Sequence, residues 1–331
     1  MIDQATIIGD GQMATVCGLI LAEKNIPCRL WSVFPESIEA LRATRENKRY
    51  LPGVKLPSTI SFTSDPRQAF AGSNLVVSAV PCQFIRSVWK RLAPAAPRDV
   101  PIVSVSKGIE NETLQRPTQI LASVLDSPIT AALSGPTIAS ELAKRLPATA
   151  VAASSDAAAA SEVQKTFSTP WFRVYTNSDV LGVELAGAMK NVIALAAGII
   201  DGLKAGDNAK AALLTRGLVE ITRLGTAMGA RRETFAGLAG LGDLVTTCIS
   251  PLGRNRSAGE AVGRGEKLDA VIASTPSVIE GIPTTRSVYE LAKRLDVPMP
   301  ITGAVHAVLF DGKDPIVALT ELMSRDLKGE E

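Results

Sequence analysis

Lys190 is the residue of this chain whose surroundings most clearly indicate chemistry. It lies in an Ala-rich, apolar segment over residues 186–192 that has a helical pattern. Burial among apolar side chains disfavours a charged ammonium, so the pKa of such a lysine falls toward neutrality. A lysine of this kind can accept or donate a proton near neutral pH.

A glycine-rich turn near the start of the chain is the second chemical motif. It has the form Gly9-x-Gly11-x-x-Ala14 and follows an aliphatic run. In a dinucleotide-binding turn the first glycine permits the tight bend and the second lets the backbone approach a pyrophosphate. Free N–H groups at the following helix terminus would hold that pyrophosphate. Together with Lys190, the turn predicts an alcohol or ketone dehydrogenase that uses NAD or NADP.

The choice between these two cofactors stays open. The second expected strand ends at residues 31–34 with no Asp or Glu for a ribose hydroxyl and no Arg for a 2′-phosphate. The basic residues that follow are interpreted as a solvated face rather than a phosphate clamp; they are Arg42, Arg45, Lys48 and Arg49.

Hydrophobic patterning indicates the elements that must position these groups. In the first half of the chain, short aliphatic runs alternate with helical patterns, which is typical of βαβ units. Expected strands lie at 6–8, 28–31, 75–80, 102–106 and 130–133, with further apolar runs at 148–153 and 172–175. Ligands bind beyond the carboxyl ends of such strands, so Lys107 and residues 135–137 should border one crevice.

Near Asn177 the pattern changes to long helical runs at 178–200, 208–228, 257–263 and 284–295. The sequence therefore predicts a Rossmann-like domain at 1–177, with a doubly wound parallel sheet and α/β architecture. An all-α domain for substrate binding is expected at 178–331.

Composition limits the function classes. The 331 residues carry 35 basic and 33 acidic side chains, so no overall field favours nucleic acid. The longest apolar stretch, 192–200, is shorter than the ~20 residues of a membrane span, and no membrane insertion is expected. Met1 leads almost directly into the first strand, which predicts no leader segment.

Four scattered cysteines have no metal-like spacing, which predicts reduced, buried thiols, no metal site and a cytoplasmic location. The single histidine, His306, is expected to be a packing residue, so His-based catalysis is not predicted.

Seven motifs in order resemble the bacterial type of NAD(P)-dependent glycerol-3-phosphate dehydrogenase. The resemblance covers residues 5–312. Its motifs are Gly9-Asp-Gly, Ser106-Lys-Gly, Ser134-Gly-Pro-Thr, Met189-Lys-Asn, Leu238-Ala-Gly-Leu-Gly-Asp-Leu, Arg254-Asn-Arg and Val278-Ile-Glu-Gly.

The resemblance implies a role for each matching position. Lys190 is implied as the catalytic proton acceptor and donor. The implied substrate contacts are Lys107, Gly135, Thr137, Lys190, Asp243, Gly253, Arg254 and Asn255. The implied cofactor contacts are Gly9, Gly11, Gln12, Met13, Val33, Lys107, Ala139, Arg254, Val278 and Glu280.

Physical arguments support several of these roles. An arginine fork beside turn amides suits a phosphate dianion, which is expected of Arg254; a solvated loop arginine is the alternative. Asp243 is expected to position Lys190 and set its protonation, or to cap a helix. For Lys190 the alternative is a lysine that snorkels from an amphipathic helix. The chain departs from the family at Asp10, Gln12, Met13, Ala14 and Val33, which bears on cofactor preference.

The resulting hypothesis is an sn-glycerol-3-phosphate:NAD(P)+ 2-oxidoreductase. It would operate mainly as a dihydroxyacetone phosphate reductase whose product feeds glycerophospholipid synthesis. The alternatives are a related dehydrogenase of another small hydroxy acid and a non-catalytic nucleotide sensor. A helical second domain is compatible with a homodimer.

Overall fold

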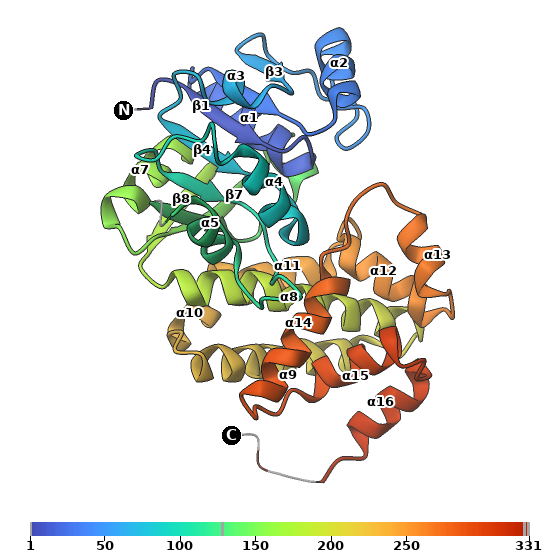
Figure 1. The fold of residues 1–331 in the computed structure, drawn as a ribbon. Helices are drawn as coiled ribbons and strands as arrows, with labels where there is room; N and C mark the ends of the chain where they lie inside the picture. The colour runs from blue at the N-terminus through green and yellow to red at the C-terminus, as the bar shows by residue number, and fades with distance from the viewer. Residues whose placement is uncertain (1, 127–128, 327–328, 330–331) are drawn as a thin grey trace.

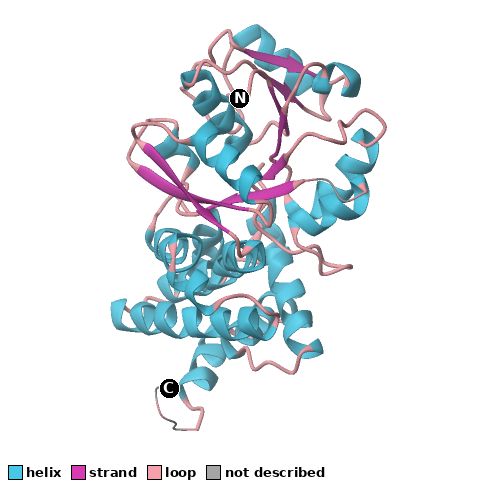
Figure 2. Cartoon of the chain, turned by 90° about the vertical axis from the view of Figure 1, so that its left-hand side faces the viewer, coloured by secondary structure: helices cyan, strands magenta, loops and turns pink. Residues whose placement is uncertain are grey.

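A β-sheet with flanking helices occupies the N-terminal half of the chain, and helices alone form the C-terminal half (Figure 1). The computed structural model describes residues 2–126, 129–326 and 329. Figure 2 shows the strands confined to the end of the molecule that holds the N-terminus. The predicted fold class, a Rossmann-like sheet followed by an all-α region, is confirmed.

The sheet has eight strands in the order β3-β2-β1-β4-β5-β6-β7-β8. Their bounds are β1 Ala5–Ile8, β2 Cys28–Trp31, β3 Ile60–Thr63, β4 Leu75–Ser78, β5 Ile102–Ser104, β6 Thr130–Ser134, β7 Ala148–Ala153 and β8 Phe172–Asn177. The chain order reverses between β1 and β4, which is where doubly wound sheets bind ligands.

Successive aliphatic residues of the central strands are buried on opposite faces, as expected for a sheet covered on both sides. Ile7 packs in the cluster that contains α1 and α7, whereas Ile8 packs in the cluster that contains α3, α4 and α5. The bounds of the helices in this half are α1 Gln12–Glu23, α2 Pro35–Thr44, α3 Pro66–Phe70, η1 Cys82–Phe84, α4 Ile85–Leu92, α5 Pro117–Leu125, α6 Ala139–Leu142 and α7 Ala157–Phe167.

Two features of the sheet differ from the sequence-based expectation. Strand β3 was not predicted, because Ile60–Thr63 has only four residues and alternates apolar with polar side chains. Strand β7 runs antiparallel to β6, so the sheet is mostly rather than wholly parallel. Strands β4 and β5 also end two residues before their predicted ends.

The helical half is arranged around α8, Val180–Gly202, which lies directly below the sheet in Figure 1. Helices α9, α11, α12 and α14 pack against it. The elements after α8 are α9 Asp207–Ala227, α10 Arg232–Ala236, the π-helical turn η2 Leu238–Gly242, α11 Asp243–Ile249, α12 Arg254–Gly263, α13 Leu268–Ala273, α14 Gly281–Arg294, α15 Pro300–Phe310 and α16 Pro315–Met323. The expected domain boundary at 177/178 lies between the end of β8 and the start of α8, and the division itself stays a prediction.

Helix α8 extends well beyond the expected apolar stretch of 192–200. Its 23 residues include a window of mean hydropathy 1.6, which is long and apolar enough to cross a membrane by length and composition. All of that window is buried inside the protein. Helix α8 is therefore the core of the helical half, which explains why residues Val183 to Ile200 are buried on every side of the helix.

The predicted roles of the cysteines and of the single histidine agree with their surroundings. All four cysteines are free and buried, and burial raises the pKa of Cys17, Cys28 and Cys248 to about 12. The ring of His306 stacks on Tyr289 with centroids 4.0 Å apart, which is a packing role. Within the described residues, no group of three His, Cys, Asp or Glu side chains could hold a metal ion.

Glycines bring α8 and α12 into direct backbone contact. A Cβ atom on Gly198 would lie 1.9 Å from the carbonyl oxygen of Arg256, and one on Gly259 would lie 2.0 Å from that of Leu195. Since backbone atoms cannot move aside as a flexible side chain can, the contact excludes any larger residue at either position.

Replacing Gly198 by alanine should therefore destabilise the protein although alanine has the higher helix propensity. Overpacking of this kind costs about 1–3 kcal/mol, and the expected result is a lower midpoint in urea unfolding. Gly303→Ala is the matched control, because a Cβ there meets only Tyr289, at 3.9 Å. Equal midpoints for the two variants would contradict the proposed backbone contact.

Candidate active site

Lys190 lies in the middle of α8, and its side chain is buried. Burial lowers the pKa of Lys190 to about 8, and the neighbouring carboxylate of Asp243 opposes this shift. The ammonium also donates a hydrogen bond to Oγ1 of Thr247. Lys190 thus has the polarity and the pKa that proton exchange near neutral pH requires.

Asp243 is the shared counterion of two lysines. Its Oδ2 lies 2.6 Å from Nζ of Lys107, and its Oδ1 lies 3.1 Å from Nζ of Lys190. The side chain of Asp243 is only 3% exposed and that of Lys190 is 8% exposed, so this pair is shielded from water, whereas Lys107 is 18% exposed. The alternative role of Asp243 as a helix cap is wrong: the residue is the first of α11, Gly242 occupies the cap position, and no side-chain cap bond forms.

Lys107 connects this ion pair to the loop after β6. Besides Asp243, its ammonium donates to the carbonyl oxygen of Gly135 at 2.8 Å and to Oγ1 of Thr137 at 3.4 Å. Gly135 has φ +135°, and a Cβ there would lie 3.0 Å from Cα of Ala150, so the turn requires glycine. The structure therefore brings together five expected residues, namely Lys107, Gly135, Thr137, Lys190 and Asp243.

The expected phosphate-binding residues begin α12. Gly253 is the N-cap of this helix and forms no side-chain cap bond. Asn255 donates to Oδ1 of Asn191 at 2.9 Å, and its own Oδ1 accepts from the backbone N–H of Gly281 at 2.8 Å. Because Asn191 directly follows Lys190, these bonds fix the start of α12 beside the buried lysine.

The guanidinium of Arg254 extends from this helix start. The residue is exposed, and one nitrogen donates to the carbonyl oxygen of Val278 at 3.1 Å. In the described chain no carboxylate lies within salt-bridge distance of it, and although the charge of Glu280 acts on it, its remaining N–H groups can hold an anion. Arg254 and Val278 were both expected at the cofactor, and the structure places them in contact.

The glycine-rich turn has the geometry of a nucleotide cradle. Gly9 has φ +120°, and a Cβ there would lie 2.7 Å from the carbonyl oxygen of Ala79. A Cβ on Gly11 would meet nothing within 4 Å, so the turn is open on that side. Gly11 caps α1 without a side-chain bond, which leaves the first amides of the helix available to a pyrophosphate.

Glu280 faces the same region from the helical half. Its Oε1 accepts the backbone N–H of Cys82 at 2.8 Å, which joins the start of α14 to the loop after β4. Its Oε2 is buried and has no hydrogen-bond partner in the part of the chain that the structure describes. Burial raises the pKa of Glu280 to about 7. The unpaired oxygen fits a site that an additional hydroxyl or amide group completes.

The other expected cofactor residues follow the carboxyl ends of β1, β2 and β6, without polar contacts that single them out. Gln12 and Met13 begin α1, and Ala139 begins α6. Met13 and Ala139 pack against the same apolar cluster. Val33 follows β2 and packs against the cluster on the opposite face.

Thr247 is a site residue that the sequence-based reasoning missed. Its Oγ1 accepts from Lys190 and donates to Oδ1 of Asp243 at 3.3 Å. The signal was present, because Thr247 lies four residues after Asp243 and thus on the same face of a helix. The spacing went unused because no helix was expected at Asp243–Ile249, where the structure has α11.

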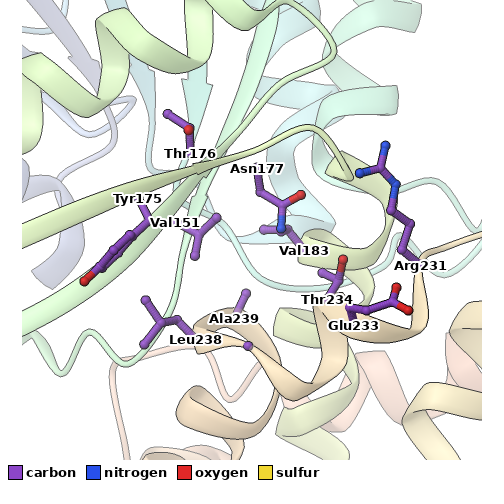
Figure 3. A pocket seen from close by; sticks show the side chains of 11 residues that line it. Val151, Tyr175, Thr176, Asn177, Val183, Arg231, Glu233, Thr234, Leu238 and Ala239 are labelled. Carbon is purple, nitrogen blue, oxygen red and sulfur yellow. The ribbon is translucent and has the colours of Figure 1, made fainter.

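Two cavities lie away from this cluster. One, of ≈ 410 Å³, lies between β7, β8 and the loops around α10 (Figure 3). The second, of ≈ 520 Å³, lies near α6 and the start of β7. Neither is lined by Lys190, Asp243 or Arg254, so cavity size alone does not locate the chemical groups.

A doubly wound sheet with this glycine-rich turn, followed by helices that supply a buried lysine–aspartate pair, defines an NAD(P)-dependent dehydrogenase. Two family models match the chain. "NAD-dependent glycerol-3-phosphate dehydrogenase N-terminus" covers residues 4–160, and the corresponding C-terminus covers residues 179–320. The chain therefore belongs to the NAD(P)-dependent glycerol-3-phosphate dehydrogenase family.

Individual relatives agree with this assignment. Proteins named glycerol-3-phosphate dehydrogenase [NAD(P)+] from Geobacter sp. (strain M21) and Geobacter sulfurreducens are each 48% identical, over 100% of this chain and 99% of theirs. The crystal structure of glycerol-3-phosphate dehydrogenase from Coxiella burnetii has a TM-score of 0.95 and is 36% identical. The match covers 98% of this chain and 99% of that one.

The shared counterion leads to a test on the pKa of Lys190. In Asp243→Asn the ammonium loses the charge that favours it, so its pKa should fall below the wild-type value of about 8. Titration of the Lys190 side chain by NMR of 13Cε-labelled lysine measures this, with Lys190→Met to assign the signal. An unchanged or higher pKa for Lys190 would argue against the pairing.

Proposed function

We propose that this protein catalyses reversible hydride transfer between NAD(P)H and dihydroxyacetone phosphate, which yields sn-glycerol 3-phosphate. The observation that carries the proposal is the buried Lys190–Asp243 pair, which Asn191 and Asn255 connect to the exposed Arg254. A proton-exchanging group and an anion-binding group thus lie at the two ends of one short site. The family relationship supports glycerophospholipid synthesis as the destination of the product.

Lys190 supplies the proton chemistry. A nicotinamide cofactor held at the turn of Gly9 and Gly11 would supply the hydride chemistry at C2 of the substrate. During reduction the ammonium of Lys190 donates a proton to the C2 oxygen, and during oxidation the neutral amine takes up the hydroxyl proton. Asp243 and Thr247 hold the nitrogen in place through contacts on two sides. Burial keeps water from competing for that proton.

The substrate's phosphate is assigned to the start of α12. Gly253 and Asn255 offer groups at a helix N-terminus, where the dipole favours an anion. Arg254 adds a planar guanidinium that suits a phosphate oxygen pair. Lys107, Gly135 and Thr137 then border the other end of the substrate, next to Asp243.

The cofactor is assigned to the turn after β1 and its surroundings. Gly9 and Gly11 would hold the pyrophosphate, with Gln12 and Met13 at the start of α1. The other residues proposed to contact the cofactor are Lys107, Val33, Ala139, Arg254, Val278 and Glu280, of which Arg254, Val278 and Glu280 come from the helical half. The unpaired Oε2 of Glu280 supports this assignment.

Three broader predictions accompany the assignment. Residues 1–177 are proposed as the cofactor-binding domain and 178–331 as the substrate domain, which agrees with the limits of β8 and of the two family models. A cytoplasmic location is proposed from the four reduced cysteines. A homodimer stays a prediction.

Loss of Lys190 should remove turnover. Lys190→Met keeps the length and apolar stem of the side chain but cannot exchange a proton, so kcat should fall about 10²–10⁴-fold. The measurement follows NADH and NADPH oxidation with dihydroxyacetone phosphate, and Lys165→Met is the control on an exposed helix face. No turnover by the wild-type protein with either cofactor would overturn the proposed function. Full activity of Lys190→Met would overturn the role of this lysine.

Loss of Arg254 should weaken recognition of the phosphate. Removing a charged hydrogen-bond donor costs about 1.5–3 kcal/mol, so Arg254→Ala should raise KM for dihydroxyacetone phosphate about 10- to 100-fold. Unphosphorylated dihydroxyacetone serves as the comparison substrate. Its weaker turnover should change little in the variant. An equal loss for both substrates would show that Arg254 does not read the phosphate.

A further inference from the structure

The carboxylate of Asp10 lies at the end of β2, although the residue follows β1 in the chain. Its Oδ2 accepts a hydrogen bond from Oγ of Ser32 at 2.9 Å and another from Oγ of Ser37 at 2.6 Å. Ser32 is buried and directly follows the last residue of β2, Trp31. The glycine-rich turn thus places an acid beside the neighbouring strand's carboxyl end.

That location has a defined role in dinucleotide-binding sheets. An Asp or Glu about 20 residues after the glycine-rich turn, at the end of the second strand, accepts a hydrogen bond from the 2′-hydroxyl of the adenosine ribose. This chain has Ser32-Val33-Phe34 there and no acid. Asp10 supplies a carboxylate at the same place from a different part of the chain.

A buried side chain holds the backbone of Asp10 in place. Buried Asn47 donates to the backbone oxygen of Asp10 at 2.7 Å and to Oγ1 of Thr15 at 2.8 Å. Thr15 in turn donates to the carbonyl oxygen of Gly11 at 3.0 Å. The second carboxylate oxygen of Asp10, Oδ1, accepts no hydrogen bond within the described chain, and the residue is half-buried. One oxygen is therefore available to a ligand hydroxyl.

The nearby cations provide little attraction for a 2′-phosphate. Arg42 donates twice to the carbonyl oxygen of Phe62, and Arg45 donates to Leu56 and Pro57. Arg42 is exposed and Arg45 is half-buried, and because both guanidinium groups donate to backbone oxygens, these two arginines do not form a phosphate clamp.

Arg49 is the cation to be tested. It is exposed, and its guanidinium lies 5.1 Å from the ring centre of Tyr50. Burial is the main cause that raises the pKa of Tyr50, Arg49 opposes the shift, and the charge of Asp10 adds to it. The opposite charges of Asp10 and Arg49 therefore both act on the Tyr50 side chain. Of these two charged groups, the carboxylate of Asp10 is held in place by two hydrogen bonds.

We propose that Asp10 is the ribose-binding acid of this protein and that it makes the enzyme select NADH over NADPH. The inference rests on the proposed function, because it assigns the cofactor site to this turn. A fixed carboxylate accepts a bond from the 2′-hydroxyl of NADH. The same carboxylate repels the 2′-phosphate dianion of NADPH.

Isothermal titration of the full-length protein with NADH and with NADPH, at constant ionic strength and without substrate, tests the proposal. We expect NADH to bind at least about tenfold more tightly. Asp10→Asn has the same shape without the charge, so it should bind NADH more weakly and NADPH more tightly. The ratio of the NADPH to the NADH dissociation constant should then approach one. Ser37→Ala should lower this ratio less, since Ser32 still holds the carboxylate.

Two controls make the result specific. Glu36→Gln removes an exposed acid one residue before Ser37 and should leave the ratio unchanged. Arg49→Ala should also leave NADH binding unchanged. Tighter binding of NADPH by the wild-type protein, lost in Arg49→Ala, would overturn the proposal in favour of a phosphate clamp. An unchanged ratio in folded Asp10→Asn would overturn it as well.

Failure of the proposed function has a different outcome. NADH binding with the expected ratio, but no oxidation of NADH in the presence of dihydroxyacetone phosphate, would retain Asp10 as the ribose acid and reject the reaction. Binding of neither dinucleotide by the folded wild-type protein would reject the cofactor site and Asp10's role together.

Discussion

The arrangement of the site depends on one buried carboxylate that pairs with two lysine side chains. An unpaired charge in the interior costs several kcal/mol, on the order of what removing one partner of a buried pair costs. Lys190 comes from the central helix and Lys107 from the loop after β5, and Asp243 pairs with both. The meeting of the sheet, α8 and α11 is therefore an electrostatic requirement as well as an apolar one.

Much of this structure could be predicted from local signals. Seven of the eight strands coincide with aliphatic runs, and the helical half follows from the loss of alternation after Asn177. Strand β3 could not be found in this way, because its four residues are stabilised by pairing with β2 rather than by their own pattern. The reversed direction of β7 likewise depends on its partner strands and has no signature in 148–153 itself.

The site was predictable residue by residue but not as a set of contacts. Lys107 and Asp243 are 136 positions apart, and no periodicity relates them. Thr247 lay within reach of the helical rule once α11 was known to begin at Asp243. The location of the Asp10 carboxylate at the end of β2 also could not be predicted from sequence order. A search along the chain finds no acid in the three residues directly after β2, whereas the fold brings one there from the preceding turn.

The glycine contact between α8 and α12 also fixes the spacing of the two helices that carry the site. Lys190 and Asn191 lie on one helix and Arg254 and Asn255 on the other, and the two backbones touch at Gly198 and Gly259. No intervening side chain can rotate to change the spacing of these helices. A larger residue at Gly198 or Gly259 would therefore shift the start of α12, with Arg254 and Asn255, relative to Lys190 without altering any of these side chains.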